Sequence, residues 1–154
     1  MAYNAQMKRR LFLASSAGVV LSLVARPVAA FAQSSVLTGL VKQYAAGGVI
    51  KESRVKFDVA RLVDNGNSVP VEVTVDSPMT QFQHVVGIKI FNEKNPQNDV
   101  AQFTLTPLSG RARVATRIRL ATTQQLVAVA KMNDGSCWTH TVEVLVTVAS
   151  CIEE

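Results

Sequence analysis

From residue 54 onward, the chain alternates apolar and polar residues over short runs, and turn-forming residues bound each run. In RVKFDVARL the apolar positions are Val55, Phe57 and Val59, and in VPVEVTV they recur from Val69 to Val75. A period of two places successive side chains on opposite faces of a strand. Runs of this kind between turn clusters indicate half-buried antiparallel strands. The chain is therefore constrained to fold mainly as β-sheet.

The same pattern continues to residue 148. The later alternating segments are HVVGIKIF, VAQFTLT, RVATRIRL, QLVAVAKM and CWTHTVEVLVTV, with turn-rich stretches such as NEKNPQND between them. Asp134-Gly135 between the last two runs is a strong hairpin signal. Several short strands in about 100 residues, with almost no helix, predict an all-β fold, an immunoglobulin-like antiparallel β-sandwich over residues 49–148.

One short helix is expected before the strands, within residues 33–48. The segment SSVLTGLVKQYAAGG offers Ser34 or Ser35 as a cap and Gly47-Gly48 as a stop. Its apolar residues recur at helical spacing, which is typical of an amphipathic helix. They are Leu37, Leu40, Val41 and Tyr44.

Residues 1–32 have the features of a cleaved secretory signal peptide. Lys8–Arg10 precede the uncharged run LFLASSAGVVLSLVA, and Ala30–Ala32 supply an A-x-A cleavage site. RRLFL has the spacing of a twin-arginine export signal, with an ordinary secretory signal as the alternative. We therefore expect a periplasmic protein that begins near Gln33, without stable membrane insertion because the apolar run is too short. Whether Met1 or Met7 starts translation stays open.

Removing this signal changes the charge of the protein. The whole chain carries +5, but four of its 16 Lys and Arg residues lie within residues 1–32, so 12 basic and 11 acidic residues remain and the net charge is +1. The remaining 122 of 154 residues suit one domain with a single core. Without a basic excess, no nucleic-acid partner is expected.

The alternation in the last predicted strand assigns its residues to two faces. Trp138 and His140 share the predicted core face with the valines, whereas Cys137 begins the outward or partner-facing side. The other predicted core-face residues are Val142, Val144, Val146 and Val148, and the other outward residues are Thr139, Thr141, Glu143, Leu145 and Thr147.

The two cysteines of the chain are Cys137, at the start of this strand, and Cys151, in the tail ASCIEE that follows it. At about 3.3 Å per residue they lie roughly 40 Å apart unless the tail folds back. A disulfide needs Cα atoms within about 7 Å, so we expect no intramolecular bridge. Glu153 and Glu154 favour the neutral thiol of Cys151, which is therefore an ordinary nucleophile that partner proteins must activate.

The sequence predicts neither a metal site nor a catalytic one. His84, Cys137 and His140 are the residue types of a blue-copper site, but Cys137 and His140 fall on opposite faces of one strand and no axial methionine follows them. A packed or rim position is the simpler interpretation of His140. The motifs G-x-S-x-G, H-E-x-x-H and a glycine-rich phosphate loop do not occur. We therefore expect no cofactor and no enzymatic activity of the domain alone.

Residues 48–148 resemble the SoxY family of sulfur-oxidation carrier proteins. The resemblance rests on DNGNSVPVEVTVDSPMT, on the long stretch FNEKNPQNDVAQFTLTPLSGRARVATRIRLA and on the final valine strand. It implies a twin-arginine signal, an immunoglobulin-like fold and a heterodimer with a small SoxZ subunit. It further implies that sulfur intermediates of thiosulfate oxidation are carried covalently on a cysteine of a C-terminal arm. That arm visits a conjugating haem protein, a sulfate-releasing hydrolase and an oxidase for sulfane sulfur.

By its position after the last strand, Cys151 corresponds to the carrier cysteine, and residues 149–154 correspond to the arm. The family arm is Gly-Gly-Cys-Gly-Gly or a close variant, whereas here Ala149, Ser150 and Ile152 flank the cysteine. Two hypotheses therefore remain: a sulfur carrier, or a non-carrier binding or assembly subunit with a vestigial arm. Cys137 and the arginines of RARVATRIR (Arg111, Arg113, Arg117 and Arg119) are either ordinary surface residues or contacts to a partner or, for the arginines, to anions.

Overall fold

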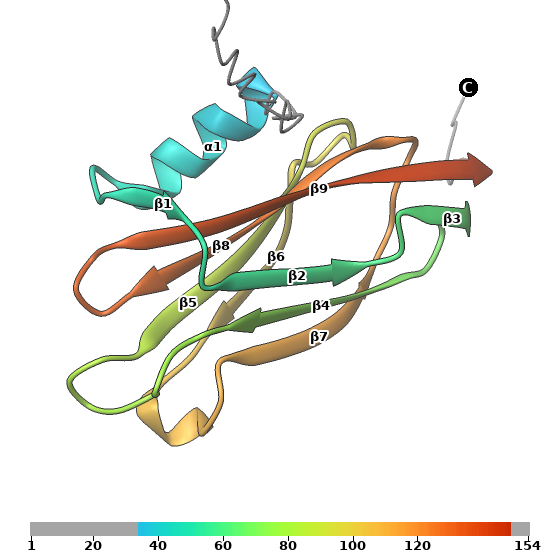
Figure 1. The fold of residues 1–154 in the computed structure, drawn as a ribbon. Coiled ribbons are helices and arrows are strands. Elements are labelled where there is room, and N and C mark those ends of the chain that lie inside the picture. Colours follow the sequence, from blue (N-terminus) through green and yellow to red (C-terminus); the bar gives the residue numbers. More distant parts are fainter. Residues whose placement is uncertain (1–33, 149–154) are drawn as a thin grey trace, which may run out of the picture. The chain divides into compact units, whose positions relative to one another are not determined.

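The computed structural model describes residues 34–148, which form a two-layer β-sandwich with one helix on its outside (Figure 1). The elements are α1 Ser35–Ala45, β1 Ile50–Glu52, β2 Val55–Val59, β3 Leu62–Asn65, β4 Val69–Val75, β5 Val85–Asn92, β6 Asp99–Thr104, the 3₁₀ turn η1 Pro107–Ser109, β7 Arg113–Ile118, β8 Gln124–Met132 and β9 Cys137–Val148. The larger sheet has the order β1-β9-β8-β5-β6 with β3 also paired to β9, and the smaller one has the order β2-β4-β7. The predicted immunoglobulin-like sandwich is confirmed.

The alternating valines of β4 show how the sequence produces this fold. Val69, Val71, Val73 and Val75 are buried, while the residues between them face outward or are half-buried. β4 pairs antiparallel with β2 on one side and β7 on the other. Its apolar side therefore faces the larger sheet, where it meets residues such as Ile88 and Leu126 in the main core.

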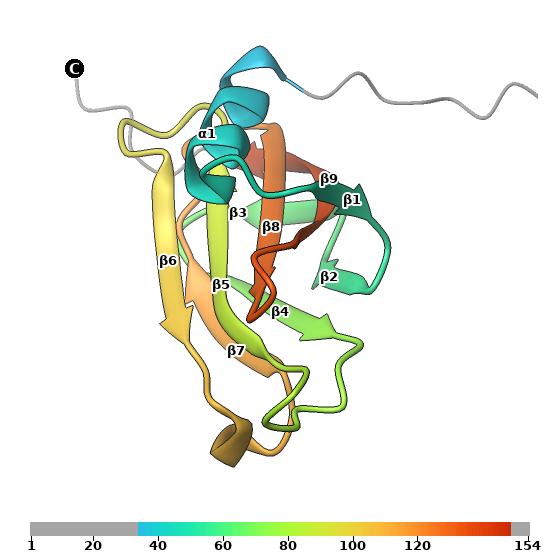
Figure 2. The same cartoon turned by 90° about the vertical axis from the view of Figure 1, so that its left-hand side faces the viewer.

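Strand β8 is buried on both sides because two different elements cover it. One face contributes Ala128 and Ala130 to the core between the sheets, and the other packs Val127 and Val129 against α1. Figure 2 shows α1 lying across β5 and β8 on the outside of the larger sheet. The near-continuous apolar run QLVAVAKM follows from this double cover.

The predicted helix is confirmed, although its ends differ from the expected signals. Ser34 is the N-cap, but its side chain forms no capping hydrogen bond; its backbone N–H instead donates to Gln125 Oε1 at 3.1 Å. The helix ends at Ala46 in the left-handed conformation, before Gly47. Gly48 is needed for a different reason, since a Cβ there would collide with the carbonyl oxygen of Gly135 in the β8–β9 turn.

The segment RVKFDVARL, predicted as one strand, is divided between the two sheets. β2 ends at Val59, and the chain then joins β9 through β3, which includes part of the predicted turn DNGN. β1 was not predicted at all, and both β1 and β3 run parallel to β9. These short pairings depend on which strand happens to lie alongside, so local alternation did not reveal them.

The predicted faces of β9 are correct, but Cys137 on the outer face is buried instead of exposed. Val144 is buried in the main core, with Trp138, Val142 and Val146 packed against that core, but Val148 at the strand end is 60% exposed. Cys137, expected on an outward position, is completely buried. The reason is α1, whose apolar side covers this end of the outer face. Within residues 34–148, no helix has the length and apolarity of a membrane span.

Candidate functional site at the end of β9

The last four residues of β9 are held in place by β3. Leu145 pairs with Leu62, and the Leu145 N–H donates to the Arg61 carbonyl at 2.8 Å. The pairing extends to Val148, whose carbonyl accepts the Gly66 N–H at 3.2 Å. The strand is therefore fixed up to its final residue.

Two threonine side chains add to this restraint on β9. Thr147 Oγ1 donates to the Asp64 carbonyl at 3.0 Å, on the side of β3. The Val146 N–H donates to Thr123 Oγ1 at 2.9 Å, which ties β9 to the beginning of β8. Thr147 thus ties β9 to β3, and Val146 ties it to the segment before β8.

The loop after β5 is held by three asparagines spaced three residues apart. Asn92 is completely buried, and its Nδ2 donates to the Gln97 carbonyl at 3.1 Å. Its Oδ1 accepts the Asn95 N–H at 3.3 Å, and Asn98 Nδ2 donates to the Asn92 carbonyl at 3.0 Å. Asparagine side chains commonly replace backbone partners in turns, so this loop is internally cross-linked.

Asn95 and Gln124 connect that loop to the segment between β7 and β8. Asn95 Nδ2 donates to the Arg119 carbonyl at 2.8 Å, and its Oδ1 accepts both the Ala121 N–H at 3.0 Å and Gln124 Nε2 at 2.7 Å. Gln124 Oε1 accepts the Lys94 N–H at 2.9 Å. NEKNPQND was predicted only as a turn; the signal available was the i, i+3, i+6 spacing of its asparagines.

The outer surface beside the end of β9 is apolar and open. Leu62 is 61% exposed and Leu145 is 49% exposed, and the two are register partners on the face opposite the core valines. α1 covers the same face only near Cys137, at the other end of the strand. Figure 1 shows β3 and the end of β9 extending past the part of the sheet that α1 covers.

The predicted carrier arm, residues 149–154, lies outside the described residues, and so does the predicted signal peptide, residues 1–32. This places Cys151, Ala149, Ser150 and Ile152 beyond what the structure describes. What the structure does supply is the attachment point of that segment, which is the end of β9 at Val148.

Cys137, the second cysteine, is a free thiol in an apolar environment. It packs with Leu37, Val41 and Val129 beneath α1. Burial raises the pKa of the Cys137 thiol, with Lys131 as a smaller opposing influence. A protonated, inaccessible thiol is a small hydrophobic core residue rather than a nucleophile, so the expected surface position and a bridge to a partner are both inconsistent with the structure.

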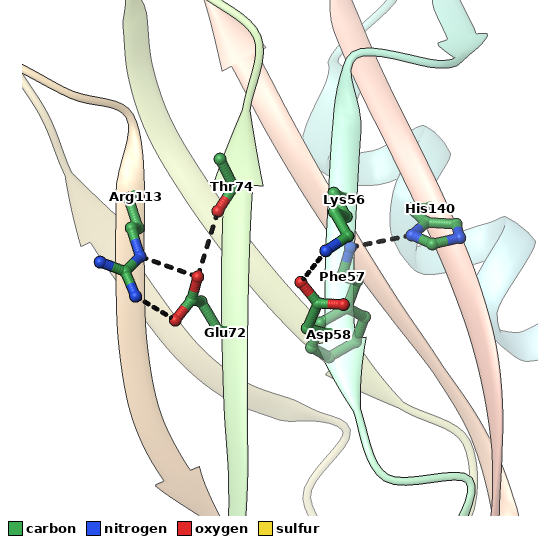
Figure 3. Close-up of polar contacts among 7 residues, drawn as sticks. All are labelled: Lys56, Phe57, Asp58, Glu72, Thr74, Arg113 and His140. Atoms are coloured by element: carbon green, nitrogen blue, oxygen red, sulfur yellow. Dashed lines mark hydrogen bonds and ion pairs between the residues drawn. The ribbon is translucent and has the colours of Figure 1, made fainter.

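The two histidines serve the backbone of neighbouring segments. His140 Nδ1 accepts the Phe57 N–H at 2.8 Å, which satisfies a donor on the free edge of β2 and joins the two sheets (Figure 3). His84 Nδ1 lies 3.0 Å from the Thr80 carbonyl. In the described part of the chain, no three His, Cys, Asp or Glu side chains come together as a metal site would require.

The predicted arginine-rich segment forms β7 and its flanks, and all four arginines are exposed. Arg113 donates to both carboxylate oxygens of Glu72, at 2.7 and 2.6 Å (Figure 3). This hydrogen-bonded ion pair lowers the pKa of the Glu72 carboxyl. An open groove across the same sheet is lined by residues of both charges, including Asp58 and Arg117.

Known structures share this fold. The sulfur carrier protein SoxY from Chlorobium limicola f thiosulfatophilum matches with a TM-score of 0.61 and 28% identity over 73% of this chain and 96% of that one. A superoxide reductase from Ignicoccus hospitalis matches with a TM-score of 0.56 and 17% identity over 63% of this chain and 94% of that one. A putative superoxide reductase from Thermotoga maritima gives 0.52 and 18%, over 67% and 89%. These two reductases share the fold alone.

No curated protein matches the chain significantly. The model of one family, described as sulfur oxidation protein SoxY, matches residues 42–151. That range includes the end of α1, every strand and the terminal cysteine position, which agrees with the structural match to a SoxY protein. The chain is a member of the SoxY family of sulfur-oxidation proteins.

Proposed function

We propose that this chain is the periplasmic sulfur-carrier subunit of a thiosulfate-oxidising multienzyme system, with Cys151 as the covalent attachment point. The observation that carries the proposal is the extent of the family match. It continues past the end of β9 to residue 151, where this chain has a cysteine. The other cysteine, Cys137, is buried under α1 and is unsuited to the task.

The chemistry needs one thiol from this chain and catalytic groups from its partners. Thiosulfate and the Cys151 thiol form an S–S bond, while the thiol loses its proton and two electrons pass to the conjugating haem protein. Water then attacks the terminal sulfonate sulfur in a hydrolase, which releases sulfate and leaves a persulfide on Cys151. An oxidase then takes electrons and protons away while water supplies oxygen atoms to the outer persulfide sulfur, which becomes a sulfonate on the Cys151 sulfur. A second hydrolysis releases this sulfonate as sulfate and restores the Cys151 thiol.

The domain contributes a rigid support and surfaces for other proteins. The end of β9 is fixed by β3 and by the hydrogen bond of Val146 to Thr123, so the arm starts from a defined point. We propose a SoxZ-like subunit as the stable partner and the periplasmic sulfur-oxidation enzymes as transient ones. Inorganic sulfur anions such as thiosulfate are the substrate class.

The test is the intact mass of the purified heterodimer after incubation with thiosulfate and the conjugating haem enzyme. The wild-type chain is expected to gain the mass of one thiosulfate-derived group, and Cys151→Ala is expected to gain none. Cys137→Ala is the matched control and should load like the wild type. No mass gain in the wild type, or a gain that persists in Cys151→Ala, would refute the carrier role.

A non-carrier assembly subunit is the second candidate, because the residues around Cys151 lack the family's glycines. Glycine makes a segment thin and conformationally free, whereas Ile152 is bulky and stiff at χ1. This candidate predicts that Cys151→Ala leaves sulfur oxidation by the host unchanged while deletion of the whole chain abolishes it. Equal losses in both strains would exclude it.

Export through the twin-arginine route is proposed from residues 1–32 and has its own test. Replacing Arg9 and Arg10 together by lysine is expected to leave the precursor in the cytoplasm, as judged by fractionation and by the size of the protein. Export of this variant at the wild-type level would favour an ordinary secretory signal.

A further inference from the structure

We propose that Leu62 and Leu145, together with the exposed end of β9, form the surface on which the enzyme that reacts with Cys151 docks. This inference rests on the proposed carrier function and adds the contact surface that the function requires. The partner it fits is a protein that presents an apolar rim around its active-site opening.

The short length of chain between the end of β9 and Cys151 limits how far the Cys151 thiol can reach. Only Ala149 and Ser150 separate Val148 from Cys151. Three residue steps span at most about 10 Å even when fully extended. A catalytic group that reaches the Cys151 sulfur must therefore come within little more than that distance of Val148.

Strand β9 does not readily lengthen this tether. Releasing Val148 would break its pairing with β3 and the hydrogen bond from Gly66. Releasing the preceding residues would also break the bonds of Thr147 to Asp64 and of Val146 to Thr123. Because every one of these hydrogen bonds would be lost from the folded protein, the docked enzyme meets β9 in its folded position.

The residues beside the end of β9 decide what the docked enzyme must contact. An active site lies below the surface of its enzyme, so the protein around the opening must cover the residues next to Val148. Those residues include the register pair Leu62 and Leu145, 61% and 49% exposed on the outer face. Large exposed apolar side chains that lie together mark interaction surfaces. Val148, the last residue before the arm, is also 60% exposed, on the opposite face of β9.

The charges at the margin complete the description of the partner. Arg61 precedes Leu62, Asp64 follows two residues later, and Glu143 lies two residues before Leu145 on the same face; all three are exposed. The margin therefore carries both signs around an apolar centre, which is the arrangement typical of protein–protein contacts. An apolar rim on the enzyme, with polar groups outside it, is the complementary surface.

Two other apolar residues on this chain are even more exposed and provide a matched control. Phe82 and Leu108 are 93% and 97% exposed, in the β4–β5 connection and in η1. Both segments adjoin the beginning of β5 and the end of β6, at the opposite end of the sandwich from Val148 (Figures 1 and 2). An enzyme engaged with Cys151 has no need to contact them.

The experiment compares rates of loading at equal heterodimer concentrations. Wild type, Leu62→Glu/Leu145→Glu and Leu108→Glu are incubated with thiosulfate and the conjugating haem enzyme, and the mass of the chain is followed with time. The double variant is expected to load at least tenfold more slowly at subsaturating carrier, while Leu108→Glu loads like the wild type. Alkylation of Cys151 by iodoacetamide should proceed at the same rate in all three.

A longer arm tests the tether directly. Inserting Gly-Ser-Gly-Ser between Val148 and Ala149 allows the thiol to reach an active site without close contact at Leu62 and Leu145. In this background the double substitution is expected to slow loading less than twofold. A loss as large as in the normal arm would overturn the tether argument.

The remaining outcomes separate the two proposals. If the wild type is not loaded at all, the carrier function fails whatever the variants do. If the wild type loads and the Leu62→Glu/Leu145→Glu variant loads at the same rate, the docking surface is wrong and the carrier function stands. If the double variant no longer copurifies with its SoxZ-like subunit, the leucines belong to the subunit interface and the inference is overturned.

Discussion

The two halves of β9 have the same alternation in sequence but different surroundings in the fold. In the first half, α1 covers the outer face and β1 pairs along the edge of the strand, and Cys137 and Thr139 are buried there. Lys51 and Arg54 additionally stack over the Trp138 ring, with Arg54 Cζ 4.7 Å from its centroid. In the second half, β3 and the beginning of β8 lie alongside in the sheet, and Leu145 on the same outer face is exposed.

The difference separates the two cysteines of the chain by role. The thiol of Cys137, in the first half, is part of an apolar cluster, and burial raises its pKa. A thiol attached beyond the second half starts from a strand end that is well fixed and has an open apolar surface beside it. One strand therefore has a first half whose outer face is closed by α1 and a second half whose outer face is open at Leu145.

The largest expected effect is the difference in thiol reactivity. In native protein, iodoacetamide should label one cysteine per chain, Cys151, and Cys137 should react at least about 10³-fold more slowly because its exposure requires unfolding. Mass spectrometry of peptides after timed labelling measures both rates. Cys151→Ala should take up no label until denaturant is added; comparable labelling of the two cysteines would contradict the comparison.

The next effect concerns the apolar cover over the first half of β9. Leu37→Ala leaves a cavity between α1 and the sheet and should lower the free energy of unfolding by about 2–4 kcal/mol. Leu145→Ala on the bare half should change it by less than about 0.5 kcal/mol. Urea unfolding of both variants gives the comparison, and equal losses would mean that the second half is also covered.

A smaller effect is expected from the loop that supports the second half. Asn95→Ala removes one donor and two accepted bonds between this loop and the segment from Arg119 to Gln124. Buried or half-buried partners left unsatisfied should cost about 1–3 kcal/mol. The exposed side chain of Gln97, in the same loop, is the control, and Gln97→Ala should be close to neutral in the same unfolding measurement.

The smallest effect is expected from the Glu72–Arg113 ion pair. This pair lies on the smaller sheet, away from β9, and therefore serves as a reference for both halves of β9. The pKa of Glu72 is lowered in the folded state, so its contribution to stability is present above the ordinary value of 4.5 and is lost as the pH falls through the folded pKa. Wild type should therefore lose slightly more thermal stability than Glu72→Gln between pH 5 and pH 3. The effect of Glu72→Gln on this loss of thermal stability should be the same when it is combined with Leu37→Ala or with Leu145→Ala. A different effect in either combination would show that the Glu72–Arg113 pair is energetically coupled to β9.

The strands with strong alternation were predictable from sequence, and those without it were not. β4 needs little more than its four valines, because each of them independently favours the same buried face. β1 and β3 have three and four residues and exist because β9 lies beside them. Parallel pairing to a strand some 80 residues away in sequence leaves no local pattern to detect.

The candidate site shows the same division. The position of Cys151 after the final strand is evident in the sequence, and so is the family resemblance. The asparagines at 92, 95 and 98 were visible as turn residues, but their bonds reach across to residues 119–124, whose position depends on how β7 returns to β8. The exposed pair Leu62 and Leu145 was likewise hidden, because Leu62 was included in the same predicted strand as Val55, whereas it lies in β3 beside β9.

By itself, the sequence determined the fold class, the helix, the main strands and the position of the final cysteine after the last strand. These features arise from periodicity and turn chemistry, which act over a few residues. Only the tertiary structure decided that Cys137 is buried and that Leu62 and Leu145 are exposed side by side. Both facts depend on which element covers each part of one β9 face, and coverage is a property of packing between segments distant in sequence.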